Sequence, residues 1–268
     1  METLKLIIEE HISFKSQLIK LAKSDLLKTY RGAALGWWWA VIKPMMTVFV
    51  FWFAFTVGLR SGKPINGYPY FLWLISGFLP WFYMSDMITQ GAGSIRKYSY
   101  LVTKMKFPIS IIPTYVSLSK LFVHWVLLAV TVTIFAIFGF KPDIYYLQIP
   151  IYMLMMFVFF TVWGLFSGML SSLSKDFMNL VRSTTHAIFW LSGVIYDIER
   201  IKNPTIRFLY NFNPITVIAR GYRNIFIYKQ WFFEDRTALM GFSVTLLVLL
   251  FLALWSFKSL RKDIPDVL

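Results

Sequence analysis

The sequence contains no cysteine, and charged residues are scarce along its 268 residues. The lack of cysteine excludes disulfides and thiolate metal sites. Charged residues make up 15% of the chain, against about 25% in a typical soluble protein. The three histidines lie in separate segments without the spacing of metal ligands, and acid or base residues form no cluster. The sequence therefore predicts neither a metal site nor an enzyme active site.

Apolar and aromatic residues take the place of the missing charges. Hydrophobic residues make up 57% of the chain and aromatic residues 19%. Crossing a bilayer as a helix takes about 20 apolar residues. Six stretches approach or exceed that length, at residues 35–59, 68–90, 109–139, 146–174, 178–196 and 237–258. We therefore expect an all-α integral membrane protein with six transmembrane helices, in which the stretch at 178–196 has the shortest uncharged part.

The distribution of Lys and Arg predicts the orientation of the chain. Residues 1–35 carry six Lys or Arg, whereas the loop at 59–67 carries two. Cytoplasmic segments are richer in such residues, so the N-terminus is expected in the cytoplasm. An even number of spans places both termini on that side of the cytoplasmic membrane, with residues 261–268 as a cytoplasmic tail. The net charge of +14 is scattered between the spans, which favours this topology and membrane lipids over a nucleic-acid partner.

The first 31 residues are predicted to form a cytoplasmic interfacial helix. Apolar residues recur at three- and four-residue spacing from Leu4 to Leu26, with polar residues between them. A soluble packing helix could show the same pattern. Its position directly before a span, with lysines on its flanks, favours a helix lying along the inner leaflet.

The longest outer segment, residues 197–236, contains two Asn-Pro pairs. Asn is a favoured N-cap and Pro suits the first helical position. Asn203-Pro204 and Asn213-Pro214 are therefore each expected to begin a short helix. Both helices are apolar and too short to span, so they are expected to dip into the outer leaflet or to fold back as a hairpin before the last span.

Three consecutive tryptophans stand at the start of the first span. Trp37, Trp38 and Trp39 are about 100° apart on a helix, so they cannot share one environment. Tryptophan favours the headgroup region of a bilayer, so one interpretation is a simple membrane anchor. The alternative is that some of the indole rings line a passage.

The few charges inside the spans are candidates for function. Lys43 and Asp86 lie at similar depth and are predicted to form a structural ion pair. Lys120 lies four residues before His124 on one helix face, without an obvious carboxylate opposite. Its side chain either extends toward the interface or lines a polar passage.

The chain has no recognisable ATP site. The segment from Gly58 to Pro64 superficially resembles a phosphate-binding loop. Its first glycine is one residue too close to Gly62-Lys63, and Pro64 replaces the Ser or Thr that would bind magnesium.

Several of these segments resemble ABC-2 type exporter permeases for polysaccharides. The opening stretch LAKSDLLKTYRGAALGWWWAVIKPMMTVFVF carries the family pattern of an interfacial helix followed by the first span. The matching positions are Asp25-Leu26, Tyr30, Leu35-Gly36, Trp39 and Pro44. KMKFPISIIPTYVSLSKL and FNPITVIARGYRNIFI resemble two later family segments, and the likeness covers nearly the whole chain. Within the family, the sequence is most similar to wall teichoic acid translocation permeases.

The resemblance implies the transmembrane subunit of an exporter rather than an enzyme. Residues 1–31 would be the interfacial helix and residues 32–260 the transmembrane domain. Two copies would form a homodimer and bind two copies of a separate ATPase, which would hold ATP and Mg. The substrate would be a lipid-linked glycan similar to teichoic acid, with O-antigen or capsular polysaccharide as alternatives. An ion-coupled flippase is a further alternative, although such a machine normally needs buried carboxylates.

The resemblance also suggests roles for particular residues. The inner loop would form a coupling helix that docks on the ATPase through an apolar stripe. Its residues are Arg96, Tyr98, Leu101, Met105 and Phe107. Aromatic rings stack on sugar faces, so the substrate pathway is expected to include Tyr30, Trp37, Trp38, Trp39, Lys43 and Lys120.

Overall fold

The computed structural model describes residues 2–59, 62–105 and 107–268. Arg60 and Ser61 fall outside these ranges, so the loop that resembles a phosphate-binding segment is described only in part. Within the described residues the regular structure is helical, apart from an isolated β-bridge between Ile65 and Tyr68.

The chain begins with two short helices and continues into the long helices of a bundle. The first half contains α1 (Glu2–Ser13), α2 (Lys15–Tyr30), α3 (Trp39–Phe53), α4 (Tyr70–Asp86), α5 (Ala92–Lys97), α6 (Ser99–Thr103) and α7 (Ile111–Ile137). The second half contains α8 (Ile149–Leu173), α9 (Lys175–Leu191), α10 (Pro204–Leu209), α11 (Pro214–Arg223), α12 (Arg236–Leu260) and α13 (Ile264–Val267). Short 3₁₀ segments at Gly36–Trp38, Ile144–Gln148, Ile198–Arg200, Tyr210–Phe212 and Phe232–Glu234, and π-helical turns at Ala54–Gly58, Met87–Gly91 and Asn224–Tyr228, extend or join these helices.

Among the described residues, five helical stretches are long and apolar enough to cross a membrane. They are Gly36–Gly58, Tyr70–Lys97, Ile111–Ile137, Ile144–Leu173 and Arg236–Leu260. The stretch predicted at 178–196 corresponds to α9, which has 17 residues and ends before a turn at Gly193 with φ +64°. Length and composition therefore support five of the six predicted spans, and the remaining span stays a prediction.

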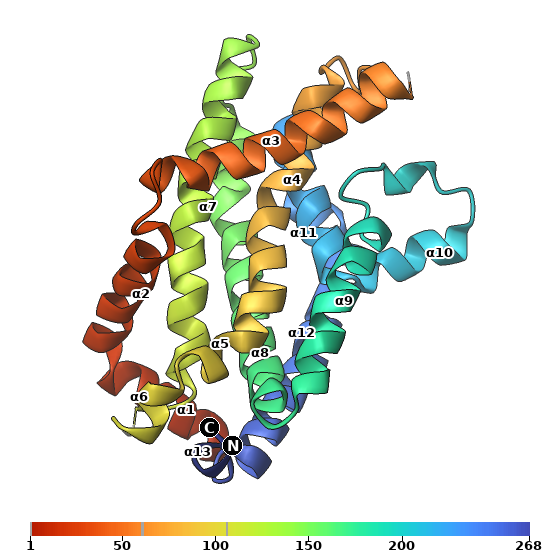
Figure 1. Cartoon of the computed structure of the whole chain (residues 1–268). Coiled ribbons are helices and arrows are strands. Elements are labelled where there is room, and N and C mark those ends of the chain that lie inside the picture. Colours follow the sequence, from red (N-terminus) through yellow and green to blue (C-terminus); the bar gives the residue numbers. More distant parts are fainter. Residues whose placement is uncertain (1, 60–61, 106) are drawn as a thin grey trace.

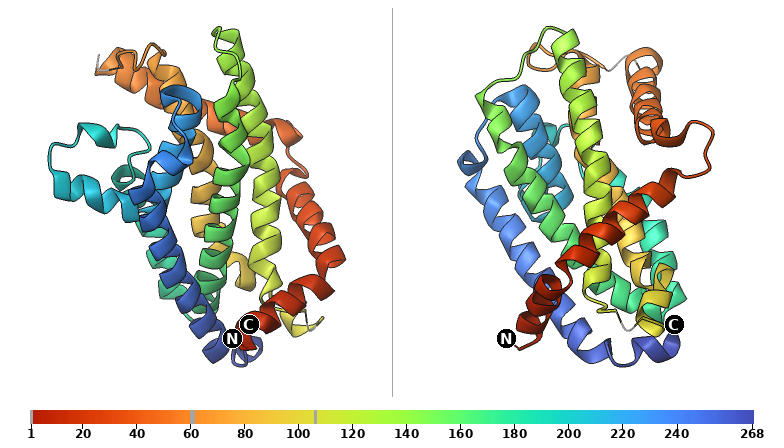
Figure 2. Two further views of the ribbon diagram at one scale, coloured as in Figure 1. Left: turned by 180° about the vertical axis from the view of Figure 1, so that it is seen from behind. Right: turned by 90° about the vertical axis from the view of Figure 1, so that its left-hand side faces the viewer.

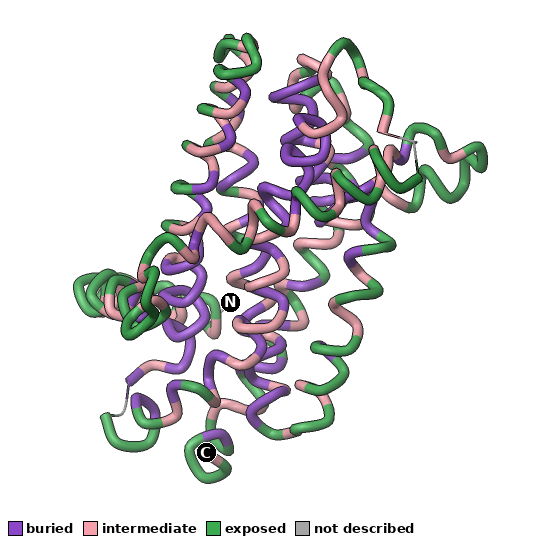
Figure 3. The backbone as a smooth tube through the Cα atoms, turned by 45° about the horizontal axis from the view of Figure 1, so that its top comes forward, coloured by how far each residue is buried: buried purple, intermediate pink, exposed green. Residues whose placement is uncertain are grey.

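Helix α4 is the centre of the bundle. It packs against α7, α11 and α3, and 12 of its 17 residues are buried. The helical stretch Gly36–Gly58 is the opposite case, because two of its residues, Ala40 and Val48, are buried. In Figure 1, α3 crosses in front of α4 and α7 at a wide angle instead of running beside them. Figure 3 shows buried residues concentrated in the interior of the bundle and exposed ones around it.

The predicted interfacial helix is two helices that meet at Phe14 and run obliquely across the bundle (Figure 2, right). Polar side chains attach it to the bundle: His11 Nε2 lies 2.8 Å from Thr114 Oγ1, and Glu10 accepts a hydrogen bond from Ser110. Part of the apolar stripe packs inward, whereas large apolar residues on the other side are exposed, namely Leu4, Ile8, Ile12, Ile19 and Leu27. An exposed apolar face of this kind suits a helix that lies in a membrane interface.

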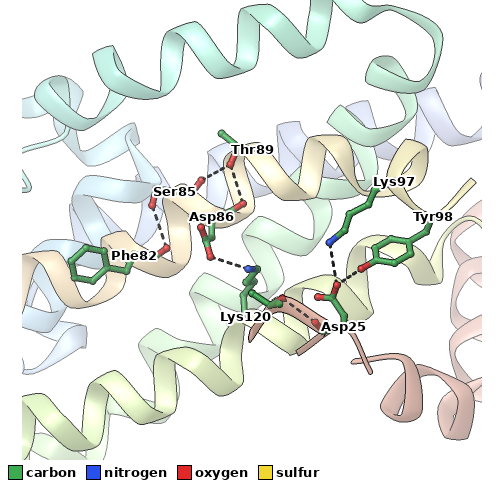
Figure 4. A network of polar contacts seen from close by, with 9 residues as sticks. Asp25, Phe82, Ser85, Asp86, Thr89, Lys97, Tyr98 and Lys120 are labelled. Atoms are coloured by element: carbon green, nitrogen blue, oxygen red, sulfur yellow. Dashed lines mark hydrogen bonds and ion pairs between the residues drawn. The ribbon is translucent and has the colours of Figure 1, made fainter. Parts of the chain in front are cut away.

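Asp25 fastens α2 to the segment after α5. Its carboxylate accepts a hydrogen bond from the Tyr98 hydroxyl and lies 3.2 Å from Lys97 Nζ (Figure 4). Burial raises the pKa of Asp25, but the Tyr98 hydrogen bond and the Lys97 charge outweigh burial and hold this pKa below its ordinary value. The ionised form is therefore the one that the folded chain stabilises.

We expect Asp25 to make the folded chain acid-sensitive. Because the folded pKa is lowered, the contribution of Asp25 is complete above the pKa of an unfolded aspartate, about 3.9, and is lost as the pH falls below that value. Asp25→Asn should therefore lower the thermal stability of the detergent-solubilised chain at neutral pH and reduce its further loss in acid. An unchanged difference in melting temperature between pH 7 and pH 3.5 would contradict this role.

The two outer helices have different surroundings. The Asn203 side chain caps α10 and the Asn213 side chain caps α11, at the positions that the Asn-Pro pairs predict. None of the α10 residues is buried, whereas nearly all of α11 is buried against α4, α8 and α12. The second helix is therefore part of the bundle core rather than a surface hairpin.

A buried arginine at the end of α11 packs against α4. The Arg223 guanidinium lies 3.6 Å from the centre of the Trp73 ring and donates to the Gly193 carbonyl at 2.7 Å. A Cβ at position 77 would come within 2.4 Å of Arg223 Nη2. The same Cβ would come within 2.8 Å of the Val194 carbonyl oxygen, so Gly77 leaves the room that the guanidinium and this carbonyl occupy beside α4.

The C-terminal residues are docked rather than free. Helix α13 contacts α6 and α8, and Ile264 is completely buried. The two termini lie at the same end of the bundle (Figure 1).

Candidate functional site

A cavity of about 490 Å³ lies where α2, α3, α4 and α7 meet. Aromatic and polar side chains share its lining, which is Thr29, Tyr30, Ala33, Trp39, Ala40, Lys43, Pro44, Thr47, Phe82, Tyr83, Ser85, Asp86, Gln90, Lys120, Val123, His124 and Leu127. Pockets of this size, with aromatic walls and a few polar groups, are the usual form of a binding site. The sequence predicted four of these lining residues for a substrate pathway: Tyr30, Trp39, Lys43 and Lys120.

The charged centre of the cavity is an ion pair between α4 and α7. Lys120 Nζ lies 3.1 Å from Asp86 Oδ2, and the side chains of Lys120 and Asp86 are 6% and 44% exposed, respectively. Figure 4 shows the two side chains pointing toward each other. Lys120 is therefore neutralised by a carboxylate that sequence inspection did not place opposite it.

This pairing corrects the predicted Lys43–Asp86 ion pair. Within the part of the chain that the structure describes, no ion pair joins Lys43 to Asp86, and Lys43 Nζ instead lies 5.5 Å from the centre of the Trp39 ring. The prediction rested on equal depth in two neighbouring spans. Because α3 crosses α4 rather than running antiparallel beside it, equal distance along the sequence does not bring these two side chains together.

The backbone next to Asp86 is irregular in a way that suits a site. Helix α4 ends at Asp86 and continues as a π-helical turn, a feature that is frequent at functional sites. The Thr89 hydroxyl donates to the carbonyls of Ser85 and Asp86 at 3.2 and 3.4 Å (Figure 4). These bonds hold the turn that presents Asp86 to the cavity.

A hydrogen-bonded group extends from the cavity wall toward α11. His124 Nε2 lies 2.7 Å from the Tyr222 hydroxyl, and Tyr222 comes from α11. On the same wall, the Tyr83 hydroxyl lies 2.6 Å from Ser117 Oγ. Sequence reasoning missed Tyr222, because the contact joins residues 98 positions apart and no local pattern marks it.

The three tryptophans have separate environments. Trp37 and Trp38 are 43% and 70% exposed, and Trp37 contacts the Tyr30 ring at a centroid distance of 5.1 Å. Trp39 is half-buried and lines the cavity. The cavity lining includes Trp39 and does not include Trp37 or Trp38, and a substrate pathway that involves all three stays a prediction.

The segment predicted to form a coupling helix is shorter than expected, and its apolar stripe faces the chain itself. Among its described residues, Arg96 and Lys97 end α5, and a separate short helix, α6, covers Ser99–Thr103. Tyr98, Leu101 and Phe107 are buried, whereas Met105 is 65% exposed. Arg96 donates to the Ser172 carbonyl at 2.9 Å, so it too faces the bundle.

The exposed side of this segment carries Tyr100, Lys104 and Met105. The expectation that Tyr98 and Leu101 need a partner to bury them is therefore wrong. Other parts of the chain cover this segment: Tyr98 donates a hydrogen bond to Asp25 of α2, and α13 contacts α6.

Known proteins resemble this chain along nearly its full length. The family model described as ABC-2 type transporter matches residues 16–227. An O-antigen export system permease protein RfbA of Myxococcus xanthus is 25% identical over 97% of this chain and 98% of its own length. A protein of the same name from Klebsiella pneumoniae is 21% identical over 94% of both chains. With its membrane-length helices and a family match over most of its residues, the chain belongs to the ABC-2 type transporter family.

Proposed function

We propose that this chain is the transmembrane subunit of an ATP-driven exporter that moves a lipid-linked O-antigen-type polysaccharide across the cytoplasmic membrane. The observation that carries the proposal is its full-length similarity to permeases named for O-antigen export. These names favour the O-antigen alternative over the teichoic acid-like polymer that the sequence resemblance first suggested. The mixed aromatic and polar lining of the α2–α3–α4–α7 cavity supports a sugar-bearing substrate.

The proposed complex contains two copies of this chain and two copies of an ATPase subunit that binds ATP and Mg. Both termini would face the cytoplasm, in agreement with their position at one end of the bundle. The exposed residues of the α6 segment, Tyr100, Lys104 and Met105, would contact the ATPase.

An ion-coupled flippase is less consistent with the cavity. Such a machine needs a carboxylate that exchanges its proton or sodium ion during the cycle. Asp86 is already neutralised by Lys120 at 3.1 Å, which supports a structural or substrate-binding role.

The proposal is tested by reconstitution. The chain should co-purify with an ATPase that carries a phosphate-binding loop, and vesicles containing both should move a labelled lipid-linked polysaccharide when ATP is added. Vesicles with an inactive ATPase variant are the control. Movement driven by an ion gradient without ATP would instead favour the flippase.

Trp39 should matter more for transport than Trp38. Trp39→Ala removes an aromatic wall of the cavity and should reduce transport about fivefold, because an aromatic contact contributes on the order of 1 kcal/mol. Trp38→Ala alters an exposed ring and should leave transport nearly unchanged. Transport per molecule in reconstituted vesicles, with expression of each variant measured in parallel, checks the difference. Equal, small losses at both positions would support a simple membrane anchor.

A further inference from the structure

A second cavity, of about 410 Å³, lies between α5, α8 and α9. These segments approach one another near the end of the bundle that holds both termini (Figure 1). Its lining is Gly93, Arg96, Lys97, Ser171, Lys175, Met178, Asn179 and Arg182. Four of these described lining residues are cationic and none is acidic, so the cavity carries a concentrated positive charge.

Part of this charge has no ion-pair partner among the residues that the structure describes. Lys97 lies 3.2 Å from Asp25 Oδ1, which compensates one of the four cations. Arg96 donates to a neutral carbonyl, that of Ser172, and keeps its charge uncompensated. Among the described residues, no ion pair involves Lys175 or Arg182, and both are exposed at the cavity. The cavity therefore favours an anionic ligand.

A buried hydroxyl provides a second, independent indication of a ligand. Ser171 is 1% exposed, and its Oγ has no hydrogen-bond partner within the described chain. Buried hydroxyls are usually paired, and this one belongs to a residue that lines the basic cavity. It can donate a hydrogen bond to an oxygen of a bound anion.

The surroundings of the cavity indicate which anion. Leu173 and Leu180 are exposed, and each lies two residues along the sequence from a cationic lining residue, Lys175 and Arg182 respectively. Exposed apolar residues directly beside cations are typical of the headgroup level of a membrane, where Lys and Arg contact phosphate. An acidic protein partner would not need these apolar neighbours.

We propose that this α5–α8–α9 cavity binds the phosphate of an anionic lipid headgroup. Lys175, Arg182 and Arg96 would provide the charge, and the Ser171 hydroxyl would donate a hydrogen bond. The phosphate has two possible sources, a bilayer phospholipid or a polyprenyl diphosphate carrier. The proposal stands independently of the transport function proposed above, because it concerns binding alone.

The test measures lipid binding by the purified full chain in detergent, with dioleoylphosphatidylglycerol as the phospholipid probe and farnesyl diphosphate as the diphosphate probe. Native mass spectrometry gives the apparent affinity for each. Lys175→Gln/Arg182→Gln should weaken binding about 25-fold, since each cation near an anionic headgroup changes affinity on the order of fivefold. Ser171→Ala should weaken it about fivefold through the lost hydrogen bond. Whichever probe shows both losses identifies the source of the phosphate.

A matched control is Lys258→Gln/Lys262→Gln, which removes two exposed cations near the C-terminus without altering the cavity. This control should bind like the unaltered chain, and gel filtration should show that every variant remains folded. Equal losses in the cavity and control variants, or no effect of Ser171→Ala, would show that binding depends on general surface charge rather than on this cavity. Either result would overturn the proposal. Unchanged binding of both probes, with loss of a co-purifying ATPase, would show a protein-docking surface and overturn it as well.

Discussion

Replacing Leu101 by Asp should prevent the chain from folding rather than merely weakening a contact with another subunit. Leu101 is 3% exposed and packs in the chain's own core. A buried charge without a partner costs about 3–5 kcal/mol, and loss of the leucine packing adds to that cost. We expect the free energy of unfolding to fall by at least about 4 kcal/mol, seen as loss of monodisperse protein after membrane extraction.

The matched variant is Met105→Asp, two positions beyond the end of α6. Met105 is 65% exposed, so the same charge should leave extraction and thermal stability almost unchanged. If the exposed side of this segment contacts an ATPase, as we propose, Met105→Asp should reduce the amount of ATPase that co-purifies. A stable Leu101→Asp chain that has lost only its ATPase would show that the stripe faces a partner after all.

Asp86→Leu should destabilise the chain more than Lys120→Met. The first change leaves Lys120, which is 6% exposed, without its counter-charge, at an expected cost of about 3 kcal/mol. The second change leaves Asp86, whose side chain is 44% exposed and can be solvated, at an expected cost of about 1 kcal/mol. The double variant Asp86→Leu/Lys120→Met should recover most of the loss, which a thermal-unfolding cycle in detergent measures.

Lys43→Met is the control for this cycle. Lys43 lines the same cavity but contacts Trp39 rather than Asp86, so its effect should add to that of Asp86→Leu without coupling. If the effects of the changes at positions 43 and 86 on stability were coupled and those at 86 and 120 were additive, the Lys43–Asp86 ion pair predicted from the sequence would be supported instead.

The sequence was sufficient where the determining forces are local. Apolar length marks the membrane helices, and the Asn-Pro pairs mark the first residues of α10 and α11, because capping involves atoms only two or three residues apart. Tyr30, Trp39, Lys43 and Lys120, which the sequence predicts for a substrate pathway, line one cavity, and their role in transport stays a prediction. Helix α9 has 17 residues, fewer than a typical span, so its crossing of the membrane remains a prediction.

The tertiary structure decided which side chains face each other. Periodicity defines the faces of one helix, but the partner of a face depends on how neighbouring helices cross and rotate, which involves residues far apart in the sequence. Helix α3 crosses α4 obliquely, and Asp86 forms its ion pair with Lys120 of α7. Helix α2 contacts the α6 segment through Asp25, and α13 packs against α6, so the apolar stripe that contains Leu101 faces the core of the chain. Composition and periodicity thus determined the helices and the membrane environment, whereas the ion pair, the cavity and the basic α5–α8–α9 site exist only because distant helices pack together.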